Sequence, residues 1–471
     1  MSYISNIHVN NKPKIGILGI MQGLYDESYP DIACRQKKFV LRVLRRLGNI
    51  ADFHFSGPVK NRKEIENVVS EFNSSSLDGI IMIMLTYSPG LLLTKALSNN
   101  NLPLLLANIQ PESKVSNNWD MSYLTFNQGV HGAQDTANII GKLGINIEVI
   151  SDDWQSENFK NFVFSWSKAA SAVNFLRHSK LASMGQMPGM GDILTDSSVF
   201  MNKIGPQINQ VSLGLIKKNM DSIEATDIDS IVNNNKIHFE LDPKLVFKNH
   251  YYAAKIQGSI QKLLEENEYS GFSIYFGAMS DDGRFRQLHM MAASNLLAQG
   301  YGYAAEGDMC CTALVSAGQH MIGNAHFTEM YAMDFEKNSV LQSHMGEGNW
   351  KIARKNRPIR LIDRKLDIGG LENPPTIVFM AEPGPATIAS LVSLPNEKFR
   401  LVVAKGEILD SEELPKIEMP YFHFRPDTGV RNCLDNWLKN CGTHHQCLNL
   451  GDQRERWRML SLILNIEYVE V

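Results

Sequence analysis

Residues 14–49 read KIGILGIMQGLYDESYPDIACRQKKFVLRVLRRLGN, and this stretch decides the fold of the first part of the chain. Its apolar run Lys14–Ile20 is typical of a buried strand, and residues 31–47 carry apolar side chains at helical spacing. Gly48 suits the end of that helix, because glycine adopts the backbone conformation that often terminates one. A buried strand followed by an amphipathic helix is the repeating unit of a parallel sheet.

The alternation of strands and helices continues beyond this unit. Apolar runs at residues 79–85 (GIIMIML) and 102–109 (LPLLLANI) predict two more buried strands. Ligands of a doubly wound parallel sheet bind at the carboxyl ends of its strands. We therefore expect functional residues just after three predicted strands, at Gln22–Tyr25, Thr86–Pro89 and Asn108–Gln110.

The second half of the chain begins with another α/β pattern and then changes character. Residues 270–279 (SGFSIYFGAM) predict a strand, and residues 288–300 (LHMMAASNLLAQG) predict a helix that ends at Gly300. Beyond about residue 326 the chain consists of short β-like runs split by Pro, Gly and charged residues, a pattern typical of antiparallel sheets and barrels. We predict an α/β fold with two doubly wound parallel-sheet domains, residues 1–177 and 178–325, followed by a C-terminal antiparallel β-barrel-like domain, residues 326–471.

Composition narrows the class of protein. The 471 residues include 46 basic and 50 acidic side chains, a near-balance that gives no electrostatic reason to expect nucleic acid or an anionic membrane as a partner. The six cysteines are too sparse for a disulfide framework. No apolar run approaches the roughly 18 residues of a membrane helix, and the N-terminus lacks the apolar core of a signal peptide. We expect a soluble, cytoplasmic protein.

Polar residues gather in three places in the second half of the chain. GYGYAAEGD (300–308) places a carboxylate between glycines, and CGTHHQC (441–447) carries adjacent histidines. Between them, HFTEMYAMDFEKNSVLQSHMGEGN (326–349) offers the polar residues Glu329, Asp334, His344 and Glu347. Taken alone, each cluster has an ordinary explanation, such as an exposed glutamate in a loop. Two carboxylates and two imidazoles together suit an octahedral divalent cation such as Mn²⁺.

The adjacent histidines leave two questions open. Neighbouring side chains of an extended segment point to opposite sides, so we predict that at most one of His444 and His445 faces a common site. Cys441 and Cys447 flank the pair and allow a structural zinc site, although the paired CxxC of common zinc modules is missing. The vicinal Cys310 and Cys311 lie in an apolar run and are interpreted as core residues.

These three clusters, in this order, resemble the L-arabinose isomerase family. GYGYAAEGDMCCTAL resembles the family's glycine-flanked Glu segment, FTEMYAMDFEKNSVLQSHM its second Glu and first His, and GTHH its last His. The resemblance implies a metal-dependent aldose–ketose isomerase of arabinose catabolism, acting on L-arabinose to form L-ribulose. It implies that one divalent cation, expected to be Mn²⁺, is held by Glu306, Glu329, His344 and His445, and that Glu306 and Glu329 are also the catalytic acid and base. The second ring nitrogen of a metal-binding histidine needs a partner, and Asp308 is a candidate for that role.

The resemblance extends to a sugar pocket. MQGLYDE, LTYSPG, NQGVHG, GMGDILTD and DIGG resemble family segments that contact sugar. They imply substrate-binding roles for Gln22, Leu24, Tyr25, Tyr87, Gln128, His131, Met190 and Ile368, and the resemblance adds Met279, which stands at a further pocket position of the family. The family expectation is a homo-oligomer, a hexamer, in which His131 reaches the site of a neighbouring subunit.

Two departures from the family pattern leave the identity of the substrate sugar open. Met279 stands where the family commonly has an aromatic pocket residue, and MGEGN replaces a more apolar run after His344. An isomerase for another sugar, such as L-fucose, D-galactose or an uncommon pentose, is one alternative. A sugar-binding relative without turnover is another, although binding alone does not need a paired acid and base.

Overall fold

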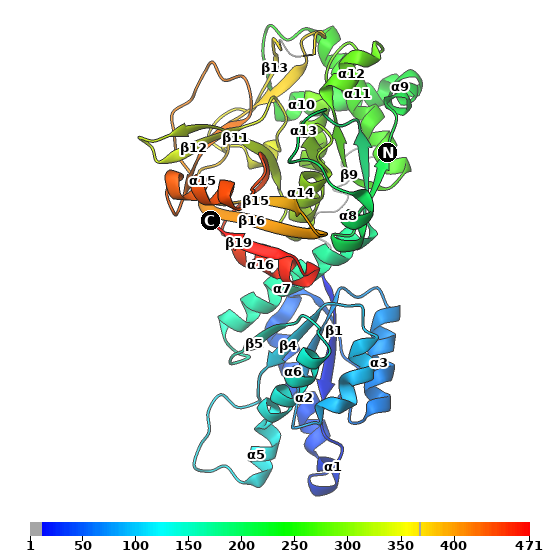
Figure 1. Cartoon of the computed structure of the whole chain (residues 1–471), viewed down its shortest axis with the longest axis vertical. Coiled ribbons are helices and arrows are strands. Elements are labelled where there is room, and N and C mark those ends of the chain that lie inside the picture. The colour runs from blue at the N-terminus through cyan, green and yellow to red at the C-terminus, as the bar shows by residue number, and fades with distance from the viewer. Residues whose placement is uncertain (1–11, 367–368) are drawn as a thin grey trace. The chain divides into compact units, whose positions relative to one another are not determined.

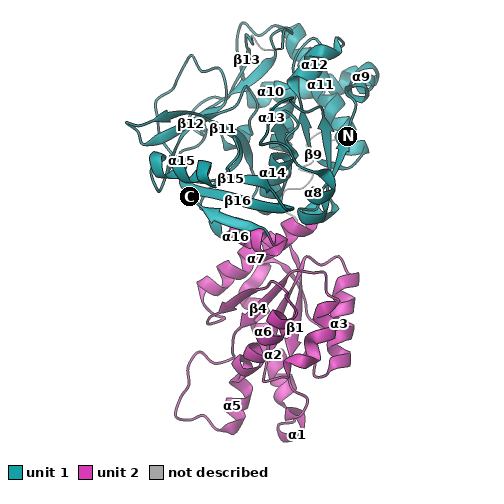
Figure 2. Ribbon diagram, viewed as in Figure 1, with its two compact units in different colours: residues 1–10, 175–457, 466–471 teal, residues 11–174, 458–465 magenta. Residues whose placement is uncertain are grey.

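The computed structural model describes residues 12–366 and 369–471 and divides into two compact units (Figures 1 and 2). The first unit along the described chain, drawn in magenta and labelled unit 2 in Figure 2, contains the described residues up to Asn174 together with Arg458–Asn465. The second contains Phe175–Trp457 together with Ile466–Val471. The finer division into three domains, at residues 177/178 and 325/326, stays a prediction.

The first unit is built on a five-stranded parallel sheet of order β2-β1-β3-β4-β5. Its strands are β1 Lys14–Ile20, β2 Asp52–His54, β3 Gly79–Met84, β4 Leu104–Asn108 and β5 Glu148–Ser151. The strand order reverses between β1 and β3, and in such sheets the crevice at this switch point is where ligands bind. The predicted doubly wound sheet is confirmed.

Helices cover the faces of this sheet (Figure 1), and its apolar side chains are buried. All six residues of β3 are buried, as expected for a central parallel strand covered on both faces. The core of one face joins β1, β3 and β4 to α3 and α6. The helices of the unit are α1 Tyr25–Ser28, α2 Ile32–Leu47, α3 Arg62–Ser74, α4 Thr94–Ser98, α5 Met121–Asn127, α6 Gly129–Lys142 and α7 Glu157–His178, the last running on into the second unit.

The second unit begins with a four-stranded parallel sheet of order β10-β9-β6-β7. Its strands are β6 Lys180–Met184, β7 Gln207–Gln210, β9 Tyr269–Ile274 and β10 Gly302–Ala305. Its helices are α8 Ser197–Lys203, α9 Leu213–Ser222, α10 Ala225–His238, α11 Phe247–Glu266, α12 Phe276–Asp282, α13 Met290–Gln299 and α14 Met309–Met321.

One sequence prediction in this region is half wrong. The run 270–279 was expected to be a strand, but β9 ends at Ile274 and α12 begins at Phe276. Continuous apolar runs do not distinguish a buried strand from a buried helix. The neighbouring strand β10 ends level with Ile274, so the sheet offers no partner beyond it. The helix predicted to end at Gly300 is confirmed, since Gly300 follows α13 with a φ of +105°.

The C-terminal strands form a sheet that closes on itself. Strands β15, β18, β11, β12, β17 and β16 pair in that order, and β15 also pairs with β16, all antiparallel. The barrel-like prediction is therefore confirmed, and β19 extends the ring as a parallel neighbour of β16. The strands are β11 His326–Asp334, β12 Ser339–Ser343, β15 Gly384–Leu394, β16 Lys398–Ile408, β17 Tyr421–Pro426, β18 His445–Leu450 and β19 Glu467–Glu470.

Smaller elements complete the second unit. A three-stranded sheet is made of β8 Glu240–Leu241, β13 Arg360–Asp363 and β14 Pro375–Val378. Helix α15 Val430–Lys439 precedes β18. Helix α16 Arg454–Leu464 precedes β19, and its residues from Arg458 onward belong to the first unit.

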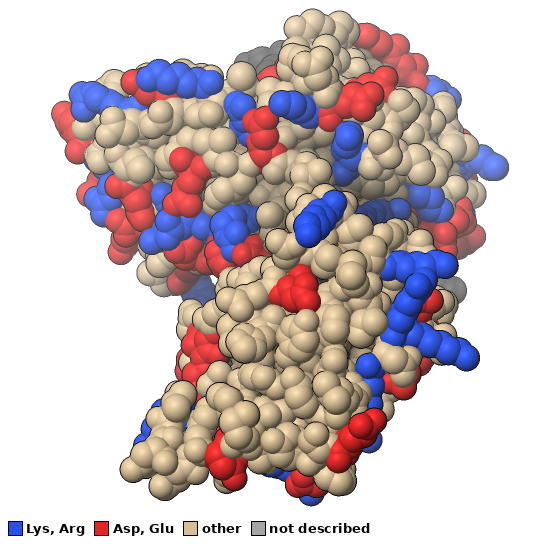
Figure 3. Space-filling model, turned by 60° about the horizontal axis from the view of Figure 1, so that its bottom comes forward, with Lys and Arg blue, Asp and Glu red and all other residues tan. Residues whose placement is uncertain are grey.

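Surface charge and helix hydropathy both bear on the class of protein. On the face seen in Figure 3, lysines and arginines lie among aspartates and glutamates, so the described part of that face has no extended patch of one charge. Within residues 12–366 and 369–471, no helix has the length and hydropathy needed to cross a bilayer.

Candidate metal centre

Glu306 stands in the tight turn between β10 and α14. Its φ is +66°, a left-handed conformation that is uncommon for a residue with a side chain. The backbone is held on both sides, because Glu306 N–H donates to the Ile274 carbonyl at 3.2 Å and Met187 N–H donates to the Glu306 carbonyl at 2.9 Å. The turn therefore fixes the direction in which this carboxylate points.

Glu329 and the two predicted histidine ligands come from three adjacent strands of the closed sheet. Glu329 on β11 lies directly opposite His445 on β18 and opposite Ser343 on β12. His344 follows Ser343 immediately. Directly opposed residues of antiparallel strands have neighbouring side chains, so strand pairing brings these residues together.

The four predicted ligands meet in two overlapping groups. The Nε2 atom of His445 lies 3.2 Å from Glu329 Oε1 and 3.6 Å from Glu306 Oε2. The Nε2 atom of His344 lies 3.7 Å from Glu329 Oε1. One group joins Glu329, His344 and His445, and the other joins Glu306, His444 and His445. The convergence of residues far apart in the sequence is the central feature of this site.

The chemistry of the cluster fits a divalent cation. Glu306 Oε2 and His445 Nε2 are buried and have no hydrogen-bond partner in the described part of the chain. Unpaired buried polar atoms are costly unless a bound ion satisfies them. Oxygen and imidazole donors suit Mn²⁺ and related cations, and their present spacing is close to the roughly 3 Å edge of an octahedron with bonds near 2.1 Å.

His344 and His445 each donate a hydrogen bond from the N–H of Nδ1 to a buried carboxylate. His445 Nδ1 lies 2.9 Å from Asp308 Oδ2, and His344 Nδ1 lies 2.6 Å from Glu347 Oε2. Such partners fix the ring orientation and the tautomer that leaves Nε2 free for a metal. Asp308 was a sequence candidate for this role and is confirmed, whereas Glu347 was only noted as polar.

Both carboxylates are themselves held in place. Asp308 Oδ1 accepts from the Cys311 N–H at 2.8 Å and so caps α14. Glu347 Oε1 accepts from the Tyr303 hydroxyl at 2.8 Å, and that hydroxyl lies 3.0 Å from His289 Nε2. The histidines therefore rest on a buried and ordered layer of hydrogen bonds.

The electrostatics reflect this crowding of opposite charges. Burial lowers the pKa of His344, but Glu347 and Glu329 raise it to about 9. Burial raises the pKa of Glu347, but His344 lowers it to about 2. The pKa of Glu329 is likewise held below its ordinary value, because His344, His445 and His444 outweigh the effect of its burial. The neighbouring imidazoles therefore hold Glu329 and Glu347 in their ionised forms.

The expectation that only one of the adjacent histidines faces the site is wrong. The Nε2 atom of His444 lies 3.6 Å from Glu329 Oε1, close to the 3.2 Å of His445. The two rings lie 4.0 Å apart between centroids. Strand β18 begins only at His445, so His444 is not bound by the alternation of a strand.

Asp192 lies in the Gly- and Met-rich loop between β6 and α8, and from this loop it binds His444. Its Oδ2 accepts from the backbone N–H of His444 at 3.0 Å and lies 2.6 Å from His444 Nδ1. Burial lowers the pKa of His444, but Asp192 and Glu306 raise it to about 10. Sequence reasoning gave Asp192 no role.

The zinc interpretation of the CxxHHxC segment gains no support from the geometry. Cys441 is exposed with a φ of +63°, while Cys447 is buried and 3.6 Å from Asn449 Oδ1. Neither of the two metal-binding groups found among the described residues contains a cysteine. Cys310 and Cys311 are buried, as the sequence predicts.

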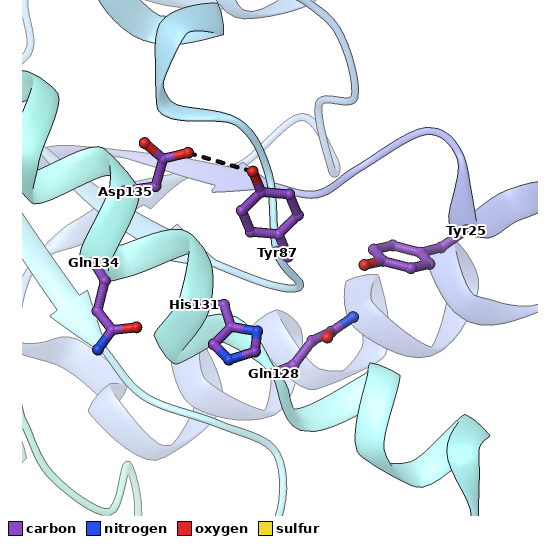
Figure 4. A pocket seen from close by; sticks show the side chains of 6 residues that line it. All are labelled: Tyr25, Tyr87, Gln128, His131, Gln134 and Asp135. Atoms are coloured by element: carbon purple, nitrogen blue, oxygen red, sulfur yellow. Dashed lines mark hydrogen bonds between the residues drawn. The ribbon is translucent and has the colours of Figure 1, made fainter.

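Four of the predicted sugar-binding residues share a pocket of about 480 Å³ in the first unit (Figure 4). Tyr25 is the first residue of α1, Tyr87 follows β3, and Gln128 and His131 lie at the start of α6. Gln134 and Asp135, which the sequence did not single out, also line it, and Tyr87 donates to Asp135 Oδ2 at 3.5 Å. The pocket lies at the carboxyl ends of β1 and β3, where ligands of such sheets bind.

The remaining predicted pocket residues are spread out. Gln22 N–H donates to Thr86 Oγ1 at 3.0 Å beside this pocket, whereas the side chain of Leu24 is exposed. In the second unit, Met190 is half-buried in the loop after β6, and Met279 is completely buried in α12. Ile368 lies outside the described residues.

Comparisons with known proteins match this architecture along its length. Family models of the L-arabinose isomerase N-terminal, central and C-terminal domains match residues 14–178, 196–324 and 324–467. The chain is 28% identical over 427 residues to the L-arabinose isomerase of Aeromonas salmonicida (strain A449), covering 87% of this chain and 84% of that protein.

Two further comparisons are more distant. The L-arabinose isomerase of Escherichia coli (strain K12) is 27% identical over 397 residues, covering 80% of this chain and 78% of that protein. A solved periplasmic solute-binding protein from Actinobacillus succinogenes 130z with bound D-allose is 11% identical, covering 66% of this chain and 92% of that chain, and its TM-score of 0.17 bears on neither fold nor function. The three domain matches, which together span most of the sequence, show that the chain belongs to the L-arabinose isomerase family of sugar isomerases.

Proposed function

We propose that this sugar isomerase converts L-arabinose to L-ribulose with one divalent cation, expected to be Mn²⁺. The observation that carries the proposal is the convergence of Glu306, Glu329, His344 and His445 from one tight turn and three adjacent strands. The L-arabinose isomerases to which the chain is similar support the choice of sugar.

His344 and His445 are suited to hold the cation, and the glutamates to share it with the sugar. The two imidazoles are almost fully buried, at 4% and 0% exposure, while Glu306 and Glu329 keep 15% and 16%. The carboxylates are therefore the more accessible members of the set. A divalent cation bound there would polarise the sugar carbonyl and offset the negative charge that develops on its oxygens.

The chemistry left to the protein is proton transfer. Isomerisation moves one proton between C2 and C1 and another between O1 and O2, so it requires a base and an acid on the same substrate. Glu329 is held in its ionised form because its pKa is lowered, and the ionised carboxylate is the form that can accept a proton. Glu306, fixed by its turn, is positioned as the second proton-transfer group.

The first test removes the metal with a chelator and measures ketose formation from L-arabinose before and after Mn²⁺ is restored. We expect activity only with metal, and we expect Glu306→Gln and Glu329→Gln to lower kcat by at least about a hundredfold, the usual scale of a lost acid or base. A Glu336→Gln variant is a matched control, because Glu336 lies in the exposed turn after β11. Full activity of the Glu306 variant would contradict its role.

A different sugar is the second candidate. Met279 replaces an expected aromatic residue and is completely buried, so it offers no ring to a ligand. A panel of L-arabinose, L-fucose, D-galactose and uncommon pentoses distinguishes the candidates by kcat/KM. A higher kcat/KM for a sugar other than L-arabinose would keep the reaction and replace the substrate.

A further inference from the structure

His444 differs from the other two imidazoles of the cluster in its accessibility. Its side chain is 35% exposed, whereas His344 and His445 are 4% and 0% exposed. Its Nε2 atom nevertheless lies 3.6 Å from Glu329 Oε1 and 4.0 Å from Glu306 Oε2. Among the three rings it is therefore the one that a bound sugar can reach.

Asp192 fixes this ring through two contacts from a single oxygen atom. Oδ2 accepts from the His444 backbone N–H at 3.0 Å and from Nδ1 at 2.6 Å. A carboxylate oxygen only accepts hydrogen bonds, so the proton of this contact resides on Nδ1. The contact consequently turns Nε2 toward the two glutamates and fixes the ring in that direction.

The loop that carries Asp192 is itself anchored. Ile193 is buried, and Asp196 caps α8 by accepting from the backbone N–H groups of Ser198 and Val199. Met187 N–H donates to the carbonyl of Glu306 at 2.9 Å. The loop thus ties the orientation of His444 to the turn that presents Glu306.

From these contacts we infer that Asp192 is a positioning residue, which holds His444 beside the cation site so that Nε2 contacts an oxygen of the bound sugar. The inference rests on the proposed isomerase function. It assigns metal binding to Glu306, Glu329, His344 and His445, and it excludes His444 from the ligands although its distances alone would admit it. A residue that acts through another has effects that are not additive with those of its partner.

The test compares Asp192→Asn, Asp192→Glu, His444→Asn and the Asp192→Asn/His444→Asn double variant. Asp196→Asn is the matched control, because it makes the same change in the same loop and asparagine still caps a helix. Mn²⁺ affinity is measured by electron paramagnetic resonance, L-arabitol binding to the Mn²⁺ form by calorimetry, and kcat and KM on L-arabinose. Thermal melting shows that each variant is folded.

We expect Asp192→Asn to weaken L-arabitol binding and to lower kcat/KM by about ten- to a hundredfold, the usual effect of removing such an orienting partner. Mn²⁺ affinity should stay that of the unaltered protein, Asp192→Glu should recover part of the loss, and the double variant should be no worse than His444→Asn alone. The Asp196→Asn protein should behave like the unaltered one.

Three results would overturn the inference. Mn²⁺ affinity that falls together with activity in the His444 variant would make this histidine a ligand. Additive losses in the double variant would show that Asp192 does not act through His444, and an Asp192→Asn protein equal to the control would show that the contact is unimportant. If the unaltered protein isomerises no sugar of the panel, the proposed function itself falls and the inference with it, a result recognised before any variant is made.

Discussion

The buried pair His344–Glu347 sets how protons compete with a metal at the cluster. The Glu347 carboxylate fixes the orientation of the His344 imidazole, because Glu347 Oε2 lies 2.6 Å from His344 Nδ1. A histidine must lose a proton from Nε2 or Nδ1 before it can coordinate a cation. Its raised pKa of about 9 therefore means that the metal-free site is protonated at neutral pH.

From this shift we expect the affinity for Mn²⁺ to rise with pH until about pH 9. The sign follows because the neighbouring carboxylates stabilise the imidazolium, so affinity is lost as the pH falls below the raised pKa. Calorimetry in buffers of different ionisation enthalpy would report the proton released on binding. Glu347→Gln should move the pH dependence toward the ordinary histidine range, and an unchanged profile would contradict this account.

Residue types alone identified part of the site. Glu306, Glu329, His344 and His445 were predicted from the resemblance of three clusters to a family, and Asp308 from its place beside Glu306. Glu347 and Asp192 were not assigned, because an acidic residue in a loop has no distinguishing local pattern. Asp192 is revealed only by its contact with His444, which lies 252 residues away in the sequence. Glu347 lies three residues after His344, and its contact depends on how the segment after β12 folds back.

At the scale of elements, the turn from β10 to α14 is the most constrained part of the site. Gly307 follows Glu306 with a φ of +89°. A Cβ at this glycine would lie 2.6 Å from Gln186 Cα and 2.6 Å from the Gly185 carbonyl oxygen. Backbone atoms cannot yield as a flexible side chain can, so only glycine fits here.

We therefore expect Gly307→Ala to lower the free energy of unfolding by about 2–4 kcal/mol, from strain and overpacking together. Mn²⁺ affinity should fall as well, because Glu306 is displaced with the turn. Gly48→Ala is the control, since Gly48 has a φ of +64° but no atom within 4 Å of the added Cβ. Denaturant unfolding and metal titration measure both effects, and equal losses in the two variants would rule out the proposed clash.

Elements were predicted well where they are long and amphipathic, and less well where apolar runs continue. The strand at Lys14–Ile20 is confirmed without change, and the helix predicted at 31–47 spans Ile32–Leu47. The run 270–279 was divided by the structure into a strand and a helix, because the end of a sheet depends on its partner strand. The orientation of His444 was predicted wrongly for a related reason. The first residue of β18 is set by pairing with β11 and β15, and His444 lies outside the strand.

At the scale of the whole molecule, the predicted sugar-binding residues fall into different compact units. His131 belongs to the pocket of the first unit, and Glu329 to the metal cluster of the second. We propose that the chain forms a homo-oligomer in which one copy supplies His131 to the metal cluster of another. Such an exchange is compatible with a two-fold dimer, in which each copy supplies His131 to the other, or with a closed ring of copies.

Mixing subunits tests this arrangement. Co-assembly of inactive His131→Ala and Glu329→Gln chains should restore about a quarter of full activity, because each half of a shared site is intact in half of the random pairings. His131→Ala mixed with Gln128→Ala is the control, since both changes affect the same unit and no pairing yields a complete site. If the first mixture shows no rescue, His131 does not contribute to the metal cluster of another copy, and the shared site is contradicted.

The sequence by itself determined the class of fold, the strand-end positions in the first unit and the four candidate metal ligands. Buried strands and amphipathic helices could be predicted because they leave local patterns in the residues, whereas the four ligands were implied by the resemblance of three clusters to a family. The pairing of β18 with β11 and β15, the approach of both adjacent histidines and the contact of Asp192 with His444 were decided by tertiary structure. Each depends on contacts between segments far apart in the sequence, and residues so far apart leave no pattern within either segment.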